Sequence, residues 1–131
     1  MKTFEDLNLS KQLQYAIDDL GFVQPTPIQS EAFSVVRSGK DVVGIAQTGT
    51  GKTAGFTLPL LERLAQTQPK MQKKQIRALV LTPTRELAAQ VAQSISDYGK
   101  YTPYRSTVIF GGVGIKHKYF FCFMCTHFHS P

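Results

Sequence analysis

The sequence predicts an α/β domain with a parallel sheet, and two observations support that fold class. Three short apolar runs, at residues 41–46, 78–82 and 106–112, have the β-branched composition of strands buried on both faces. The segments between them carry apolar residues at helical spacing. Strands that alternate with helices in this way are typical of a parallel sheet with crossover helices. With 131 residues, the chain has room for one domain with a hydrophobic core.

Two helices are predicted before the first strand. The first follows Ser10, its expected N-cap, and stops at Gly21, which suits a helix C-terminus. The second follows Thr26 as N-cap, has Pro27 at its first helical position and ends at Gly39. In the first segment, Leu13, Ile17 and Leu20 make one apolar stripe.

A phosphate-binding loop is predicted at residues 46–53, AQTGTGKT, after the first strand and before a helix over about residues 52–65. Its glycines permit unusual dihedrals and a close approach of the backbone, and the helix N-terminus directs N–H groups at an anion. Lys52 is expected to reach the β and γ phosphates, and Thr53 to place its hydroxyl on Mg²⁺. The general pattern GxxxxGK[ST] is broken only by Ala46, and a glycine-rich turn without a ligand is the alternative. The residues expected to bind nucleotide here are Ala46, Gln47, Thr48, Gly49, Thr50, Gly51, Lys52 and Thr53.

The second and third strands enclose a further helix. The run at residues 78–82 leads through Pro83 into a helix predicted over about residues 84–98. Leu87, Val91 and Ile95 lie on one face of that helix.

These features resemble the DEAD-box RNA helicases of superfamily 2, and the short N-terminus and AGFTLPLL after the loop resemble bacterial members. The sequence GFVQPTPIQ at residues 21–29 is similar to the family's Q motif, and Phe4 stands seventeen positions before Gly21, where the family has an aromatic residue. The family form of the loop is AxxGxGKT, which accounts for Ala46. The resemblance implies a RecA-like fold that uses ATP and Mg²⁺.

Within the Q motif, the resemblance implies that Phe22 stacks on adenine and Gln29 reads its edge. A Gln side chain carries a donor and an acceptor side by side, which matches N6 and N7 of adenine. Thr26 and Gln29 also have the spacing of a capping box, T-x-x-Q, which is the alternative role for Gln29. Gln29 can serve both purposes if it uses different atoms.

An RNA surface is implied by two further motifs. PTREL at residues 83–87 is similar to the family's motif Ia, and the pair Gly111 and Gly112 to its RNA-contacting glycine doublet. A strand that ends at a helix N-terminus offers free N–H groups, and an arginine adds charge for a phosphate. A plain N-cap followed by a solvated arginine is the alternative. The residues expected to contact the RNA backbone, without sequence specificity, are Pro83, Thr84, Arg85, Gly111 and Gly112.

Charge is distributed unevenly along the chain. Residues 1–66 carry six Lys or Arg and seven Asp or Glu, a net charge of −1, whereas residues 67–115 carry seven against two, a net charge of +5. A basic half favours a polyanionic partner such as RNA, although residues 70–74, KMQKK, by themselves suit a solvated loop. No secretory signal or apolar run of about 20 residues is present, so we expect a cytoplasmic protein without a membrane span.

The resemblance divides the chain into a Q-motif region (residues 1–39), a partial RecA-like domain (40–115) and a tail (116–131) that has no counterpart in the family. The tail holds both cysteines and all three histidines, and we expect it to be irregular. Cys122, Cys125, His127 and His129 are spaced too closely for the usual structural zinc site, so zinc is a minor alternative, as is an aromatic tail that docks on the exposed sheet. An aberrant end without a selected function is the main interpretation.

The family's Asp-Glu-Ala-Asp tetrad and second domain do not occur in the sequence. We therefore expect a truncated helicase that binds ATP and RNA but neither hydrolyses ATP nor unwinds RNA; the alternatives are a non-enzymatic ATP- and RNA-binding module or a non-functional truncated product. We also expect the missing strands to leave apolar edges of the sheet exposed, at residues 41–46 and 78–82.

Overall fold

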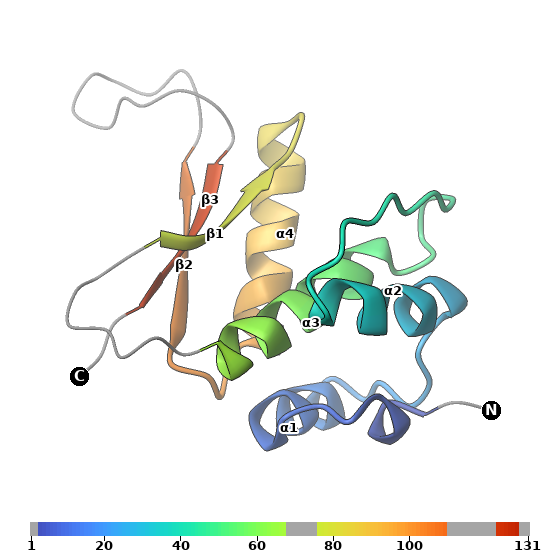
Figure 1. The fold of residues 1–131 in the computed structure, drawn as a ribbon. Coiled ribbons are helices and arrows are strands. Elements are labelled where there is room, and N and C mark those ends of the chain that lie inside the picture. The colour runs from blue at the N-terminus through green and yellow to red at the C-terminus, as the bar shows by residue number, and fades with distance from the viewer. Residues whose placement is uncertain (1–2, 68–75, 110–122, 129–131) are drawn as a thin grey trace, which may run out of the picture.

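The computed structural model describes residues 3–67 and 76–109 together with the backbone of residues 123–128 (Figure 1). Four α-helices, one short 3₁₀ helix and three strands occur in these residues. In chain order the elements are η1 (Glu5–Leu7), α1 (Lys11–Asp19), α2 (Pro27–Arg37), α3 (Lys52–Gln66), β1 (Ile76–Leu81), α4 (Arg85–Tyr98), β2 (Tyr104–Ile109) and β3 (Phe123–Phe128).

All four predicted helices form, and some of their ends follow the predicted signals. At the start of α2, which has Pro27 in its first turn, one half of the predicted capping box forms: the N–H of Thr26 donates to the side chain of Gln29, whereas the Thr26 hydroxyl is buried without a hydrogen-bond partner among the described residues. Thr84 caps α4 through its hydroxyl, which accepts a hydrogen bond from the N–H of Leu87 at 3.2 Å. The side chain of Ser10, by contrast, makes no cap hydrogen bond at the start of α1.

The N-terminus of α1 is held instead by a residue far along the chain. The N–H of Ser10 donates to the carboxylate of Glu62 on α3, at 2.9 Å. Glu62 is buried, and its other oxygen accepts from the side chain of Gln66 at 3.4 Å. A carboxylate beside a helix N-terminus is also favoured by the helix dipole, so Glu62 takes over the role predicted for the Ser10 side chain.

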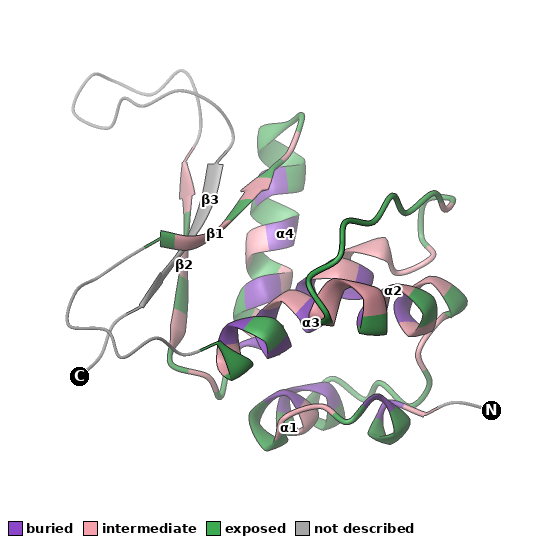
Figure 2. Cartoon of the chain, in the orientation of Figure 1, coloured by how far each residue is buried: buried purple, intermediate pink, exposed green. Residues whose placement is uncertain are grey.

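The hydrophobic core lies where α3 meets α1, α2 and α4. Leu58 and Leu61 of α3 are almost completely buried, and Figure 2 shows the buried residues gathered on the facing sides of the helices. The other core side chains are Phe4, Leu7, Leu13, Ile17, Phe33, Ala54, Val91, Ile95 and Tyr98. The helices therefore supply the described core almost alone.

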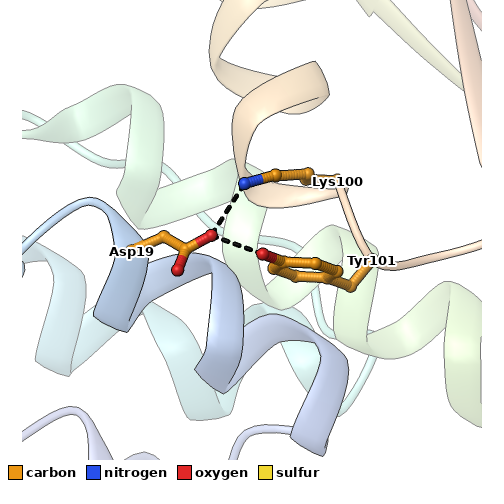
Figure 3. Close-up of polar contacts among 3 residues, drawn as sticks. All are labelled: Asp19, Lys100 and Tyr101. Atoms are coloured by element: carbon orange, nitrogen blue, oxygen red, sulfur yellow. Dashed lines mark hydrogen bonds and ion pairs between the residues drawn. The ribbon is translucent and has the colours of Figure 1, made fainter.

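The end of α1 is joined to the end of α4 by a surface cluster of Asp19, Lys100 and Tyr101 (Figure 3). The ammonium of Lys100 and the hydroxyl of Tyr101 both donate to one carboxylate oxygen of Asp19, at 2.7 and 2.5 Å. Tyr15 on α1 packs edge-on against the ring of Tyr101. The hydrogen bonds from Lys100 and Tyr101 lower the pKa of Asp19, and the bond to Asp19 raises the pKa of Lys100.

The sheet differs from the predicted one. Its strand order is β1-β3-β2, and β3 is antiparallel to both neighbours, with Phe123 opposite both Leu81 and Ile109. The prediction of a parallel sheet was therefore wrong for the observed pairing, as was the prediction of an irregular tail. The reason is backbone hydrogen bonding: β1 and β2 each need a strand beside them, and β3 contains two phenylalanines and a threonine, residue types that are common in strands.

The predicted first strand, at residues 41–46, does not form. The segment has no strand assignment, and Val43 and Ile45 are 87% and 91% exposed. A strand requires a hydrogen-bonded neighbour, and within the described residues the backbone of residues 41–45 makes no hydrogen bond. The prediction of a strand buried on both faces was wrong, whereas the expected exposure of apolar residues at 41–46 and 78–82 is confirmed.

None of the described helices has both the length and the apolar character that crossing a membrane requires.

Candidate nucleotide-binding site

The predicted phosphate-binding loop is a tight curl that ends at the N-terminus of α3. Gly49 and Gly51 have φ angles of +79° and +83°, so both lie in the left-handed region that the sequence predicted for them. Gly51 is the N-cap residue of α3. The hydroxyl of Thr50 donates to the carbonyl of Gln47 at 2.7 Å and closes the curl. The first N–H groups of α3 have no partner within the helix, which makes this end suitable for an anion.

The ammonium of Lys52 lies against the loop itself. It donates to the carbonyl of Gln47 at 2.7 Å and also to the carbonyl of Ala46. An ammonium has three N–H donors, and two of them bond to these carbonyls, so one remains for a ligand. All three become available if the side chain turns away from the two carbonyls. The hydroxyl of Thr53, the next residue, has no hydrogen-bond partner in the described part of the chain. The ammonium of Lys52 and the free hydroxyl of Thr53 therefore both belong to the first turn of α3.

Gln29 connects the Q-motif segment to the phosphate-binding loop. Its side-chain oxygen accepts from the N–H of Thr26 at 2.9 Å, and its side-chain nitrogen donates to the carbonyl of Gly51 at 3.2 Å. The capping-box role is therefore confirmed, and it uses one of the two lone pairs of the oxygen. One lone pair and one N–H remain, which are the groups that adenine N6 and N7 require. The bond to Gly51 joins two segments that the sequence separates by 22 residues.

Phe22 is supported by two other aromatic rings. Its ring stacks on that of Phe4 with centroids 6.1 Å apart, and the ring of Tyr98 lies 6.2 Å away. Phe4 is buried, whereas Phe22 is 39% exposed and keeps part of its ring surface for a ligand. The contact with Tyr98 was missed in the sequence, because no local signal connects a residue at the end of α4 with the Q motif.

A cavity of about 360 Å³ lies between the Q motif and the loop. It is lined by Thr26, Pro27, Ile28, Glu31, Ile45, Ala46 and Thr50, and Phe22 is not among these residues. The structure therefore brings Gln29 and the loop together and leaves Phe22 beside Phe4 and Tyr98.

The predicted RNA-contacting residues are exposed where they are described. Pro83, Thr84 and Arg85 lie at the start of α4, and Arg85 makes no hydrogen bond or ion pair with another described residue. Thr84 acts as an N-cap, as its alternative interpretation predicted. Gly111 and Gly112 lie outside the described residues.

The possible zinc ligands also lie beyond what the structure describes. Cys122 and His129 fall outside the described residues, and Cys125 and His127 lie on β3, where only the backbone is described. Within the described side chains, no group of three or more His, Cys, Asp or Glu is placed to hold a metal ion.

Comparison with known proteins identifies relatives over most of the chain. The family model described as DEAD/DEAH box helicase matches residues 26–121. The ATP-dependent RNA helicase RhlB of Pseudomonas syringae is 45% identical over 112 residues, which are 84% of this chain and 28% of RhlB. The ATP-dependent RNA helicase DeaD of Escherichia coli is 50% identical over 99 residues, which are 76% of this chain and 15% of DeaD.

A solved structure with the same fold is the RNA helicase Prp28 from Chaetomium thermophilum bound to ADP. It matches with a TM-score of 0.75 and 33% sequence identity, over 88% of this chain and 28% of that chain. This chain thus spans less than a third of the length of these relatives. The match supports an incomplete α/β domain of the RecA-like type.

Proposed function

Because this chain belongs to the DEAD/DEAH box helicase family, we propose that it binds ATP at the loop of residues 46–53. The observation that carries the proposal is the hydrogen bond from Gln29 to the carbonyl of Gly51, at 3.2 Å. It fixes a residue able to read adenine directly against the loop able to hold phosphates. To recognise a nucleoside triphosphate, a protein needs a group that reads the base and a loop that holds the phosphates close to each other.

Each residue of the site has a separate task in this proposal. The loop N–H groups from Ala46 to Gly51 and the N-terminus of α3 surround the phosphates, and Lys52 supplies a positive charge to them. Gln29 directs its free lone pair and its second N–H to the edge of adenine. Phe22 offers its exposed ring surface to the face of the base, and Phe4 and Tyr98 hold that ring in place.

The site also fits Mg²⁺. This ion usually keeps several waters and takes few protein ligands, with phosphate oxygens completing its shell. The free hydroxyl of Thr53 at the start of α3 provides one such ligand. When bound, Mg²⁺ would neutralise phosphate charge, while Lys52 and the loop N–H groups hold the phosphates in position.

We also propose that the start of α4 binds the backbone of RNA. Arg85 is exposed and unpaired among the described residues, beside the free N–H groups of the helix N-terminus, and residues 67–115 carry a net charge of +5. Pro83 and Thr84, next to Arg85 in the sequence, are assigned to the same surface, and Gly111 and Gly112, outside the described residues, stay predicted RNA contacts. Contacts of this kind would hold RNA without reading its sequence.

The proposal is limited to binding. The family's Asp-Glu-Ala-Asp tetrad does not occur in these 131 residues, so no residue of the chain is assigned to the activation of water. The residues described here therefore support the binding of ATP and RNA, and the relatives are ATP-dependent RNA helicases.

The test is titration of the purified chain with a fluorescent ATP analogue in the presence of Mg²⁺. Lys52→Ala removes a charge-assisted interaction and should weaken binding by about tenfold or more. Lys11→Ala removes one positive charge from exposed α1 and serves as the matched control, with binding expected to stay within about twofold. Equal affinity of the Lys52→Ala variant and the parent chain, with both folded by circular dichroism, would overturn the proposal.

A further inference from the structure

The position of Phe22 is set by the end of helix α1. The helix ends at Asp19, and Gly21 follows with a φ angle of +69°. The N–H of Gly21 donates to the carbonyl of Asp18 at 3.0 Å. The N–H of Phe22 donates to the carbonyl of Ile17 at 3.1 Å, so the backbone of Phe22 is bonded to the last turn of α1. A shift or rotation of that turn therefore carries Phe22 with it.

The last turn of α1 is itself fastened to the end of α4. The ammonium of Lys100 and the hydroxyl of Tyr101 both donate to one carboxylate oxygen of Asp19, at 2.7 and 2.5 Å (Figure 3). The ammonium also lies 4.9 Å from the centre of the Tyr101 ring, which adds a cation–π contact. We call these three residues the Asp19 cluster. It connects the turn that carries Phe22 to the two residues that follow α4 by one position.

The end of α4 also contacts the ring of Phe22 directly. Tyr98, the last residue of α4, is 8% exposed, and the centre of its ring lies 6.2 Å from that of Phe22. One residue, Gly99, separates Tyr98 from the Asp19 cluster. The segment of residues 98–101 therefore holds Phe22 in two ways, through its ring and through the helix to which its backbone is bonded.

The Asp19 cluster lies apart from the groups proposed to bind phosphate. None of its three side chains lines the cavity between the Q motif and the loop, and among the described residues none makes a hydrogen bond to residues 46–53. We propose that Asp19, Lys100 and Tyr101 are positioning residues for the base: they keep the ring of Phe22 where it stacks on adenine and leave the binding of phosphates unchanged. This inference rests on the proposed function, which assigns Phe22 to the base.

The expected effect is modest because the Asp19 cluster is partly exposed. The side chains of Lys100 and Asp19 are 57% and 47% exposed, and exposed ion pairs of this kind change an equilibrium by up to about fivefold. Removal of the Asp19 carboxylate breaks the bonds to Lys100 and to Tyr101 together. We therefore expect a loss of about two- to fivefold in the affinity for a ligand that carries the base.

The test compares two ligands of the full 131-residue chain, both with Mg²⁺: ATP, which has a base, and inorganic tripolyphosphate, which has none. Each ligand displaces a fluorescent ATP analogue, and the displacement gives its affinity. Asp19→Ala should weaken ATP by about two- to fivefold and leave tripolyphosphate unchanged. Equal losses for the two ligands would show a general loss of structure, and an unchanged affinity for ATP would show that the Asp19 cluster does not act on the base. Either result would overturn the inference.

Asp18→Ala is the matched control for Asp19→Ala. It removes the same charge from the same turn of α1, so any effect of the helix dipole is common to both variants. The side chain of Asp18 accepts from that of Gln14 in its own helix, at 2.8 Å, and not from the end of α4. Asp18→Ala should therefore bind both ligands like the parent, and an ATP loss equal to that of Asp19→Ala would contradict the role of the Asp19 cluster.

A double-mutant cycle shows whether the Asp19 cluster acts through Phe22. Phe22→Ala removes the stacking ring, so Asp19→Ala should have no further effect on ATP in that background. An additional loss of two- to fivefold there, about as large as in the parent, would mean that the cluster acts by another route and would refute its positioning role.

Lys52→Ala separates this inference from the proposed function. It removes a charge that faces the phosphates, so it should weaken ATP and tripolyphosphate alike, whereas Asp19→Ala should weaken ATP alone. If Lys52→Ala changes neither affinity, the proposed phosphate site fails. A loss confined to ATP in Asp19→Ala would still support the positioning of Phe22 by the Asp19 cluster.

Discussion

Replacement of Gly51 by alanine should destabilise this chain more than the same change at Gly49, because only Gly51 contacts Gln29. Both glycines have left-handed dihedrals, with φ of +83° and +79°, and alanine in that conformation costs about 1–2 kcal/mol. A Cβ at Gly49 would meet no atom within 4 Å. A Cβ at Gly51 would lie 2.3 Å from the side-chain nitrogen of Gln29, which must therefore move.

The displacement of Gln29 adds a second cost to Gly51→Ala. It breaks the hydrogen bond between the Gln29 side chain and the carbonyl of Gly51, and an unsatisfied buried amide costs about 1–3 kcal/mol. We therefore expect a loss of unfolding free energy of about 1–2 kcal/mol for Gly49→Ala and about 2–5 kcal/mol for Gly51→Ala. Urea unfolding followed by circular dichroism measures both values.

A double-mutant cycle with Gln29→Ala isolates the contact. Without the long side chain at residue 29, the added Cβ has room, so Gly51→Ala should then cost about 1–2 kcal/mol, as Gly49→Ala does. The cost of Gly49→Ala should not change in the Gln29→Ala background. If Gly51→Ala and Gly49→Ala cost the same with Gln29 present, the described contact between the Q motif and the loop does not hold the loop, and the reasoning fails.

Two further predictions concern the surface. In the folded chain the pKa of Asp19 is lowered below its ordinary value of 3.8 and that of Lys100 is raised above 10.5, so the extra stability of the parent over Asp19→Asn should be constant between about pH 5 and pH 9. This extra stability should shrink as the pH falls through the folded pKa of Asp19, and again as the pH rises through the folded pKa of Lys100. Urea unfolding of both chains across this pH range measures the difference. A stability difference that grows in acid would contradict the prediction. Arg85→Ala should weaken binding to single-stranded RNA and reduce the slope of log affinity against log salt by about 0.7, whereas Lys11→Ala should leave the slope unchanged. An unchanged slope for Arg85→Ala in a filter-binding titration would remove Arg85 from the RNA surface.

The helices and the loop conformation followed from the sequence because their determinants are local. The cap at Thr84 acts over three residues, and the half capping box of Thr26 and Gln29 acts over the same distance. The left-handed dihedrals of Gly49 and Gly51 follow from the lack of a side chain at these positions. Interactions of this range are contained in a short stretch of sequence, so a short stretch predicts them.

Strand pairing was not determined locally. The run at residues 41–46 has the composition of a buried strand, yet it lies exposed because none of the described strands bonds to it. The residues of β3 lie beyond the family match at residues 26–121, yet β3 pairs with both β1 and β2. A strand forms its hydrogen bonds with a partner strand. The composition of the first strand does not reveal where along the chain that partner lies.

The sequence by itself determined the family, the helices and the left-handed glycines of the loop at residues 46–53. Only the tertiary structure decided that Gln29 bonds to Gly51, that Phe22 rests on Phe4 and Tyr98, and that Glu62 holds the start of α1. The physical reason is the range of the interactions involved. Dihedral preferences and caps act within one turn of the chain, whereas ring stacking, long-range hydrogen bonds and strand pairing exist only once distant segments are brought together.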